Sequence, residues 1–173
     1  MSTKQKEDTC PGGNVVTWDT WEHFDGSPSR FDFKIIDRKP MIVCPIAWHE
    51  VLWEKGKLLG GLDQTYQKRD CIVLEIDPKD PNYHYSKGVM YADKKTGLAY
   101  STTWYDRKGE PWVWIWDAYR LDGNGIPVPG NNCYIDLKRD YAANPVIAYS
   151  RHNQCRESDY WDVENLKRTF PNR

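Results

Sequence analysis

The chain has 173 residues, a length that suits one domain able to bury a core without metal or disulfide support. Its 24 basic and 25 acidic residues give a formal net charge of −1, with no long run of one sign, so a nucleic-acid-binding surface is not expected. The chain is polar on average but holds nine Trp and eleven Tyr. Such side chains suit cavity walls and interfaces as well as cores.

The first residues, MSTKQKEDTCPGG, are polar and end in Pro-Gly-Gly. We therefore expect residues 1–13 to form a flexible lead-in and residues 14–173 to form a single β-rich domain. The N-terminus lacks the apolar segment of a signal peptide, and no stretch reaches the roughly 18 apolar residues of a membrane-spanning helix. The expectation is a soluble chain, either cytosolic or a mature or truncated portion of an exported protein.

Apolar runs outside the middle of the chain predict five strands: residues 30–37, 41–45, 71–76, 133–137 and 145–150. Arg38-Lys39-Pro40 is expected to end the first of them, and residues 126–130 (IPVPG) are expected to be an extended, strand-breaking linker. Residues 46–66 combine helical spacing with three glycines, which indicates a short helix or an irregular loop. Residues 162–168 predict a short C-terminal helix.

The middle of the chain predicts a three-stranded antiparallel meander over residues 84–93, 98–105 and 110–119. Each connection ends in a glycine, which can take the left-handed conformation that a four-residue hairpin loop needs. Such loops pair Asp93 with Leu98 and Tyr105 with Glu110, and this register assigns every side chain to a face.

One predicted face carries Trp112, Trp114, Trp116, Ala99, Ser101, Thr103, Gly88, Met90 and Ala92. The other carries Val113, Ile115, Tyr100, Thr102, Trp104, Val89 and Tyr91. Because neither face is simply polar, both need covering by a helix, a second sheet layer or a ligand. The assignment depends on register, since a slip of one residue moves a strand's side chains to the wrong face.

The tryptophan stripe has two interpretations, which the sequence leaves open. It is either ordinary core, or the wall of an apolar cavity between the indoles and their small neighbours. A buried acyl chain would contribute roughly 0.8 kcal/mol per methylene, so shape alone could give affinity. The second interpretation makes the candidate ligand-binding residues Trp112, Trp114, Trp116, Met90, Ser101 and Thr103.

Catalytic and metal-binding motifs are not evident, and we expect no enzyme, no cofactor and no metal. The sequence lacks G-x-S-x-G, H-E-x-x-H and a glycine-rich phosphate loop. His49-Glu50 is the best acid–base candidate, but a packed or surface role fits it better. Residues 77–82 and 122–125 hold Asp and Asn that could ligate calcium, although their spacing is that of ordinary turns.

The five cysteines show no C-x-x-C and no ligand-like spacing to histidine. We expect Cys44 and Cys71 to be buried free thiols in strands. Cys133 and Cys155 flank one segment, which a disulfide between them could close; the alternative is that both are free thiols.

Several segments carry a family resemblance: FDGSPSRFDFKIIDRKPMIVCP, QKRDCIVLEIDPKDPN, YHYSKGVMYADKKTGLAYSTTWYDRKGEPW and the closing DYWDVENLKRTFPNR. Its most specific parts are the hairpin with Tyr91, Asp93, Thr96 and Gly97 and the turn at residues 105–112. Together they resemble the C-terminal part of a family of uncharacterised proteobacterial envelope proteins. That family is similar to the outer-membrane lipoprotein-sorting (LolA/LolB-like) proteins.

The resemblance implies an antiparallel half-barrel wrapped around helices, with an apolar concave face that receives acyl chains. It also implies a periplasmic or outer-membrane-associated protein whose partners are a lipid or other hydrophobic small molecule, and outer-membrane or transporter proteins. No catalytic residues come with it. Members are commonly longer, with an N-terminal region and an export signal, so we expect an incomplete half-barrel with an exposed strand edge.

The sequence therefore predicts a mainly β protein, an antiparallel curved sheet or half-barrel with one or two short helices. Its predicted role is non-enzymatic binding or carriage of a lipid, acyl chain or sterol-like ligand in the bacterial cell envelope. The alternative is a structural or interaction subunit that docks through its aromatic face or open sheet edge onto a larger assembly or oligomer.

Overall fold

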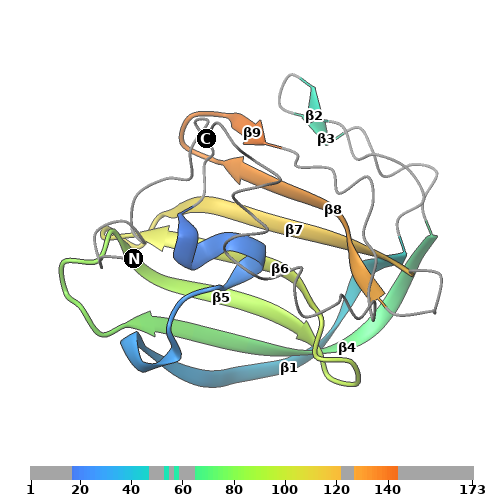
Figure 1. Ribbon diagram of the computed structural model, residues 1–173, viewed down its shortest axis with the longest axis horizontal. Helices are drawn as coiled ribbons and strands as arrows, with labels where there is room; N and C mark the ends of the chain where they lie inside the picture. The colour runs from blue at the N-terminus through green and yellow to red at the C-terminus, as the bar shows by residue number, and fades with distance from the viewer. Residues whose placement is uncertain (1–16, 47–52, 55–56, 59–64, 122–126, 144–173) are drawn as a thin grey trace, which may run out of the picture.

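The computed structural model describes residues 17–46, 53–54, 57–58, 65–121 and 127–143, and Figure 1 shows their arrangement. One antiparallel seven-stranded sheet has the order β1-β4-β5-β6-β7-β8-β9. Its strands are β1 Phe31–Ile46, β4 Thr65–Pro78, β5 Tyr85–Asp93, β6 Ala99–Asp106, β7 Pro111–Leu121, β8 Pro127–Asp136 and β9 Tyr141–Ala143. The sheet is not closed, because β1 and β9 are its two ends.

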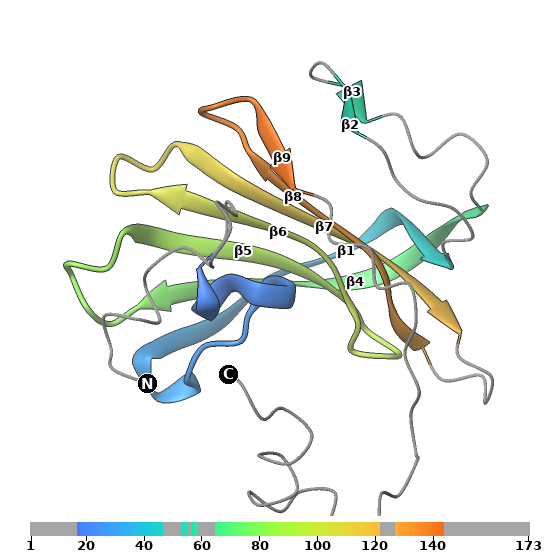
Figure 2. The same ribbon diagram turned by 45° about the horizontal axis from the view of Figure 1, so that its top comes forward.

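The smaller elements are two 3-10 helices, η1 Trp18–His23 and η2 Pro28–Arg30, and a two-stranded sheet of β2 Trp53–Glu54 and β3 Lys57–Leu58. Figures 1 and 2 show η1 in front of the middle of the large sheet. Within the described ranges, no helix is long and apolar enough to cross a membrane. The prediction of a mainly β, open antiparallel sheet with short helices is confirmed.

Two strand predictions need correction. Residues 30–37 and 41–45 belong to one strand, β1, in which Pro40 pairs with Asp70. Proline is tolerated there because β1 is an edge strand, where an N–H pointing away from the sheet is not needed. The expected linker at 126–130 is also wrong, since β7 extends to Leu121 and pairs with β8 from Pro127 onward.

Other predictions concern residues outside the described part of the chain. They include the lead-in at 1–13, the strand at 145–150, the helix at 162–168 and most of residues 46–66. His49-Glu50 and the turn at 122–125 fall outside it as well. The three strands of the central meander are confirmed, each within two residues of its predicted bounds.

The register of the meander differs from the prediction in both hairpins. Between β6 and β7, Thr103 pairs with Trp114, a shift of two residues that leaves residues 101–104 and 113–116 on their predicted faces. Between β5 and β6, a β-bulge inserts Tyr100 as an extra residue, and Met90 pairs with Thr102. The predicted faces of β5 are therefore wrong by this slip of one residue. Met90 lies on the face of the sheet opposite to Thr103.

Following the pairs across the sheet defines two faces. The η1 face carries Phe33, Ile35, Ile72, Leu74, Ile76, Gly88, Met90, Ala92, Thr102, Trp104, Val113, Ile115 and Tyr134. The Trp114 face carries Val73, Val89, Tyr91, Ser101, Thr103, Trp114, Trp116, Cys133 and Ile135. His23 of η1 contacts Thr102, which places η1 on the face named after it.

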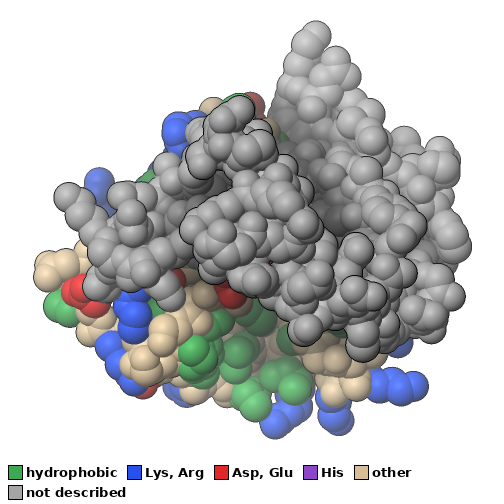
Figure 3. Space-filling model, viewed as in Figure 1, with side chains coloured by type: hydrophobic (Ala, Val, Ile, Leu, Met, Phe, Trp, Pro, Cys, Tyr) green, Lys and Arg blue, Asp and Glu red, His purple; other side chains and the backbone are tan. Residues whose placement is uncertain are grey.

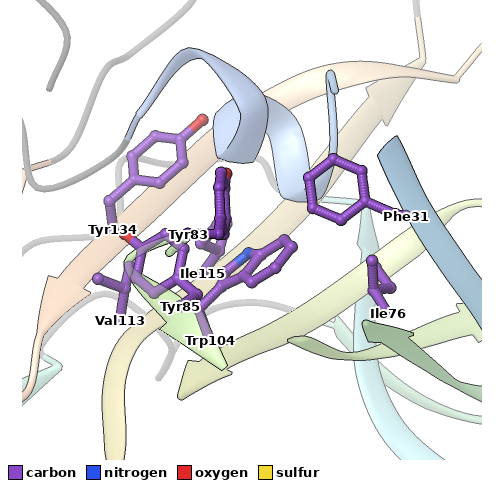
Figure 4. Close-up of a cluster of buried hydrophobic side chains, with 8 residues drawn as sticks. All are labelled: Phe31, Ile76, Tyr83, Tyr85, Trp104, Val113, Ile115 and Tyr134. Carbon is purple, nitrogen blue, oxygen red and sulfur yellow. The ribbon is translucent and has the colours of Figure 1, made fainter. Parts of the chain in front are cut away.

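The main hydrophobic core lies on the η1 face and is rich in aromatic side chains. Its buried members are Phe31, Ile76, Tyr83, Tyr85, Trp104, Val113, Ile115 and Tyr134. Figure 4 shows them gathered beneath the η1 ribbon. The Tyr85 and Trp104 ring centroids are 5.2 Å apart. Gly88 underlies the Trp104 indole so closely that a Cβ there would lie 3.0 Å from its ring carbons.

A second core lies on the Trp114 face, where β1 contacts β7. It contains Cys44 from the far half of β1 together with Trp116, Ala118, Cys133 and Ile135. The open sheet is thus curved enough for one edge strand to cover part of its own face. Cys71 and Cys133 are buried free thiols, which confirms the prediction for Cys71 and contradicts a bridge from Cys133 to Cys155.

Candidate functional site

The six predicted ligand-binding residues separate into two groups. Trp114, Trp116, Ser101 and Thr103 share the Trp114 face, as predicted. Met90 lies on the η1 face, where it packs against the main core. Trp112 also leaves the predicted stripe, because a bulge between Trp104 and Tyr105 gives it no partner in β6.

Trp112 turns toward the main core at this bulge. Its ring centroid is 5.3 Å from that of Tyr85, and its Nε1 donates a hydrogen bond of 3.3 Å to Asp136 Oδ2. On the opposite side of the sheet, Trp116 is only 7% exposed and belongs to the second core. The core interpretation of the stripe therefore fits Trp116, whereas Trp114 is half-buried and donates to Ser101 Oγ at 2.8 Å.

A partly covered apolar surface adjoins the main core on the η1 face. We call it the apolar shelf and define it as Phe33, Ile35, Ile72, Leu74, Met90 and Ala92. Leu74 and Met90 are half-buried and border the core, while Phe33 and Ile35 are 42% and 46% exposed. Figure 3 shows hydrophobic side chains exposed in the lower part of the molecule, over β1 and β4. An apolar surface of this kind suits a hydrophobic ligand.

A basic pocket of about 470 Å³ lies at one end of the apolar shelf. Its lining residues are Lys68, Arg69, Asp70, Asp93, Lys94 and Lys95. A smaller pocket of about 130 Å³ shares Asp70 and Lys94 and adds Arg38, Lys39, Pro40 and Cys71. Arg38 pairs with Ile72 of the shelf, so the charged and apolar regions are neighbours.

A buried polar cluster lies between η1 and the sheet, and no motif in the sequence indicates it. His23 Nδ1 is 2.9 Å from Thr102 Oγ1, and His23 Nε2 is 3.2 Å from Asp117 Oδ2. Each of these residues is at most 1% exposed. A Thr-His-Asp arrangement can move protons in principle, and here all three side chains are buried. Its role is to hold η1 against the η1 face.

The loop at residues 77–82, which holds Asp and Asn that could ligate calcium, contains an ordinary turn. Asp80 Oδ1 accepts a hydrogen bond from the Asn82 backbone N–H at 2.8 Å, as in an Asx turn. No group of three or more His, Cys, Asp or Glu side chains in the described ranges is arranged to hold a metal ion.

These elements define a class of fold: an open, curved antiparallel sheet with one apolar face beside a short helix. Two solved structures have a similar overall fold. A Vibrio parahaemolyticus domain named for outer membrane lipoprotein sorting matches with a TM-score of 0.62 at 17% identity, covering 95% of this chain and 58% of that one. A Desulfovibrio piger protein of the DUF1329 family matches with a TM-score of 0.52 at 15% identity and the same coverages, 95% and 58%.

The family follows from the sequence comparison. The model of the family described as "Protein of unknown function (DUF1329)" matches residues 2–167, and the chain belongs to this family. No curated protein matches it. The chain spans 58% of the length of each of the two solved structures, and at these identities the likeness concerns the fold alone.

Proposed function

We propose that this protein is a non-enzymatic binder or carrier of a hydrophobic ligand in the bacterial envelope, and that the ligand lies on the apolar shelf. The observation that carries the proposal is the row of half-buried and exposed apolar side chains beside η1, from Ile35 through Leu74 to Met90. A ligand that covers this row would remove apolar area from water, which contributes roughly 25 cal/mol per Å². The fold shared with a domain named for lipoprotein sorting supports the same role.

The Trp114 face is a less suitable surface for a long hydrocarbon. Lys87 Nζ is 3.2 Å from Glu75 Oε2 on this face, and Lys34 pairs with Glu75 across the strands. An acyl chain lying there would remove these charges from water, which is costly. Trp116 is already buried in the second core. Trp114, with Ser101 and Thr103, belongs to the binding surface that the sequence predicted, and this surface is now the alternative.

A pair of adjacent substitutions separates the two faces. Met90→Arg places a charge on the apolar shelf, and Val89→Arg places the same charge on the Trp114 face of the same strand; both positions are half-buried. The quenching of tryptophan fluorescence measures the binding of a long-chain fatty acid. We expect Met90→Arg to weaken binding at least about tenfold, equivalent to about 1.4 kcal/mol, and Val89→Arg to have little effect.

The reverse pattern would move the ligand to the Trp114 face. If the wild-type chain shows no saturable quenching with fatty acids or sterols, and purified protein carries no lipid, the proposal fails. Circular dichroism on both variants establishes that each is folded before its affinity is compared.

We further propose self-association through β1 as a second function, favoured by the exposed edge strand. Every residue from Asp32 to Pro40 is exposed, and Ile36 and Ile42 are 44% and 63% exposed. The extra residue at the β1 bulge puts Lys34 and Asp37 on the same face of the sheet. If two copies of β1 pair antiparallel with Ile35 opposite Ile36, Lys34 lies opposite Asp37 of the other copy.

The same alignment places Asp32 opposite Lys39, so opposite charges meet at each of these positions, a favourable arrangement for cross-strand pairs. Analytical ultracentrifugation of wild-type chain over a range of concentrations would show a dimer. Lys34→Asp should weaken it, and Lys34→Asp with Asp37→Lys should restore it. A monomer at every concentration contradicts this second function.

A further inference from the structure

We infer that the ligand is an anionic amphiphile, with its chain on the apolar shelf and a carboxylate or phosphate headgroup in the basic pocket. This inference rests on the proposed function and adds the chemical class of the ligand.

The apolar shelf continues into the basic pocket along two paired strands. On the η1 face, Leu74 pairs with Met90 and Ile72 pairs with Ala92. Two residues further along the same face come Asp70 and Lys94, whose backbones remain paired because the Lys94 N–H donates to the Asp70 carbonyl at 2.9 Å. At roughly 3.3 Å per residue, the step from Leu74 to Asp70 is about 13 Å. A chain laid along β4 therefore meets the pocket at one end.

The pocket carries more positive than negative charge. Its cations are Lys68, Arg69, Lys94 and Lys95, against the carboxylates of Asp70 and Asp93. The smaller adjoining pocket adds Arg38 and Lys39 and no further carboxylate. This excess of positive charge attracts an anion, and the attraction should weaken as salt is added, because the lysines are exposed.

The carboxylate of Asp93 is occupied by groups of the protein itself. Its Oδ1 accepts hydrogen bonds from the backbone N–H groups of Lys95 at 2.7 Å and Thr96 at 3.0 Å. Its Oδ2 is 3.8 Å from Arg69 Nη1. Asp93 thus stabilises the hairpin turn and repels a bound anion less than a free carboxylate would.

Donors for an anion remain in the pocket. Arg69 lies on the Trp114 face with Asp93 and its Nε is buried, so the accessible donors of the pocket are the exposed lysines. None of the ion pairs formed between described side chains uses Lys68, Lys94 or Lys95. Ammonium and guanidinium groups make short, charge-assisted hydrogen bonds to carboxylate and phosphate oxygens. A headgroup at this position would pair with these donors while its chain covers the shelf.

The test compares a long-chain fatty acid with the neutral alcohol of equal chain length, by calorimetry on the whole chain. We expect wild type to bind the acid about tenfold more tightly than the alcohol, with the preference shrinking as salt rises. Lys68→Gln with Lys94→Gln should abolish the preference and leave the affinity for the alcohol unchanged. The matched control is Arg107→Gln with Lys108→Gln, the same loss of charge in the exposed β6–β7 turn, which should keep the preference.

Equal binding of acid and alcohol by wild type would overturn the headgroup inference and leave the proposed function in place. Binding of neither would overturn both. The affinity for an alkyl phosphate of the same chain length, compared with that for the fatty acid, shows which headgroup, phosphate or carboxylate, binds more tightly. If inorganic phosphate alone binds as tightly as the alkyl phosphate, the pocket is a site for free anions and the amphiphile is contradicted.

Discussion

Asp117 is a carboxylate with only 1% exposure, buried beneath η1. Its Oδ2 faces His23 Nε2 at 3.2 Å, and its Oδ1 has no hydrogen-bond partner among the described residues. His23 Nε2 is the basic nitrogen closest to this carboxylate among the described ion pairs, although the contact lacks hydrogen-bond geometry. Glu22 and His23 reach their positions with left-handed φ angles of 45° and 76°, a conformation that costs energy in residues with side chains. Contacts beneath η1 outweigh that cost.

Removal of the histidine should destabilise the protein strongly. We expect His23→Ala to lower the free energy of unfolding by about 3 kcal/mol or more, because it leaves the Asp117 carboxylate buried without its partner. Urea unfolding measures the loss. In the double variant with Asp117→Asn, the loss should be smaller than the sum of the two single losses. A loss below about 1 kcal/mol for His23→Ala would show that the pair does not hold η1.

Gly88 is required by the packing of Trp104, whose side chain is fully buried. Gly88→Ala would bring a methyl group to 3.0 Å from the indole ring carbons, which cannot move aside easily in a filled core. We expect a loss of about 1–3 kcal/mol in urea unfolding. The control is Gly97→Asn, in an open turn with a left-handed φ of 74° that asparagine tolerates. Equal effects of the two substitutions would refute the packing explanation.

Two turns of the sheet are joined through Asp106. Its Oδ1 accepts backbone N–H groups of Lys108 at 2.8 Å and Glu110 at 2.9 Å, and its Oδ2 accepts a hydrogen bond from Lys138 in the β8–β9 turn. The Lys138 ammonium, followed by these backbone donors, lowers the pKa of Asp106 to about 2. The pair thus links the β6–β7 turn to the β8–β9 turn.

This shift sets the pH range in which Asp106 stabilises the fold. An unfolded aspartate has a pKa of about 3.9, so the contribution is fully present above that pH and is lost as the pH falls toward 2. We expect Asp106→Asn to destabilise the protein near neutral pH and much less at pH 2, by urea unfolding at each pH. Lys138→Met should raise the pKa of Asp106 toward its ordinary value. A pH-independent effect of Asp106→Asn would contradict this account.

Local sequence signals predicted the turns of the meander well, but not the register of the strands that they join. Gly97 and Gly109 have φ angles of 74° and 81°, the left-handed conformation that the loops were expected to need. Asp93 and Asp106 accept turn amides, so each turn is encoded by nearby residues. The strand alternation of β6 and β7 also placed Trp114 correctly on the same face as Thr103, although the predicted register paired Thr103 with Trp112.

The bulges could not be predicted from local sequence, and they moved part of the candidate site. Tyr100 is an extra residue in β6, and it is buried with Val43 of β1, a strand distant in the sequence, and with Tyr119 of the neighbouring strand β7. The residue pattern within the hairpin does not indicate the contact of Tyr100 with Val43. The resulting slip placed Met90 on the η1 face, and a second bulge did the same for Trp112. The bulges thus decide which face of the sheet carries each of these two residues.

The molecule as a whole is an open sheet that is apolar in its middle and basic at one end of the η1 face. The main core and η1 fix one side of the apolar shelf, and the basic pocket marks its end. Both regions lie along β4 and β5, so the two strands would hold a ligand by its chain and its headgroup together. The exposed β1 edge beside them is free of strand partners other than β4 among the described residues.

Photo-crosslinking would locate the ligand on the sheet. The wild-type chain is irradiated with a long-chain fatty acid that carries a diazirine near the end of its chain, and labelled peptides are sequenced by mass spectrometry. We predict labels on shelf residues of β4 and β5, such as Leu74 and Met90, that an excess of unlabelled fatty acid removes. Labels on Thr103 and Trp114 instead, or labels that unlabelled fatty acid does not compete, would contradict a ligand site on the apolar shelf.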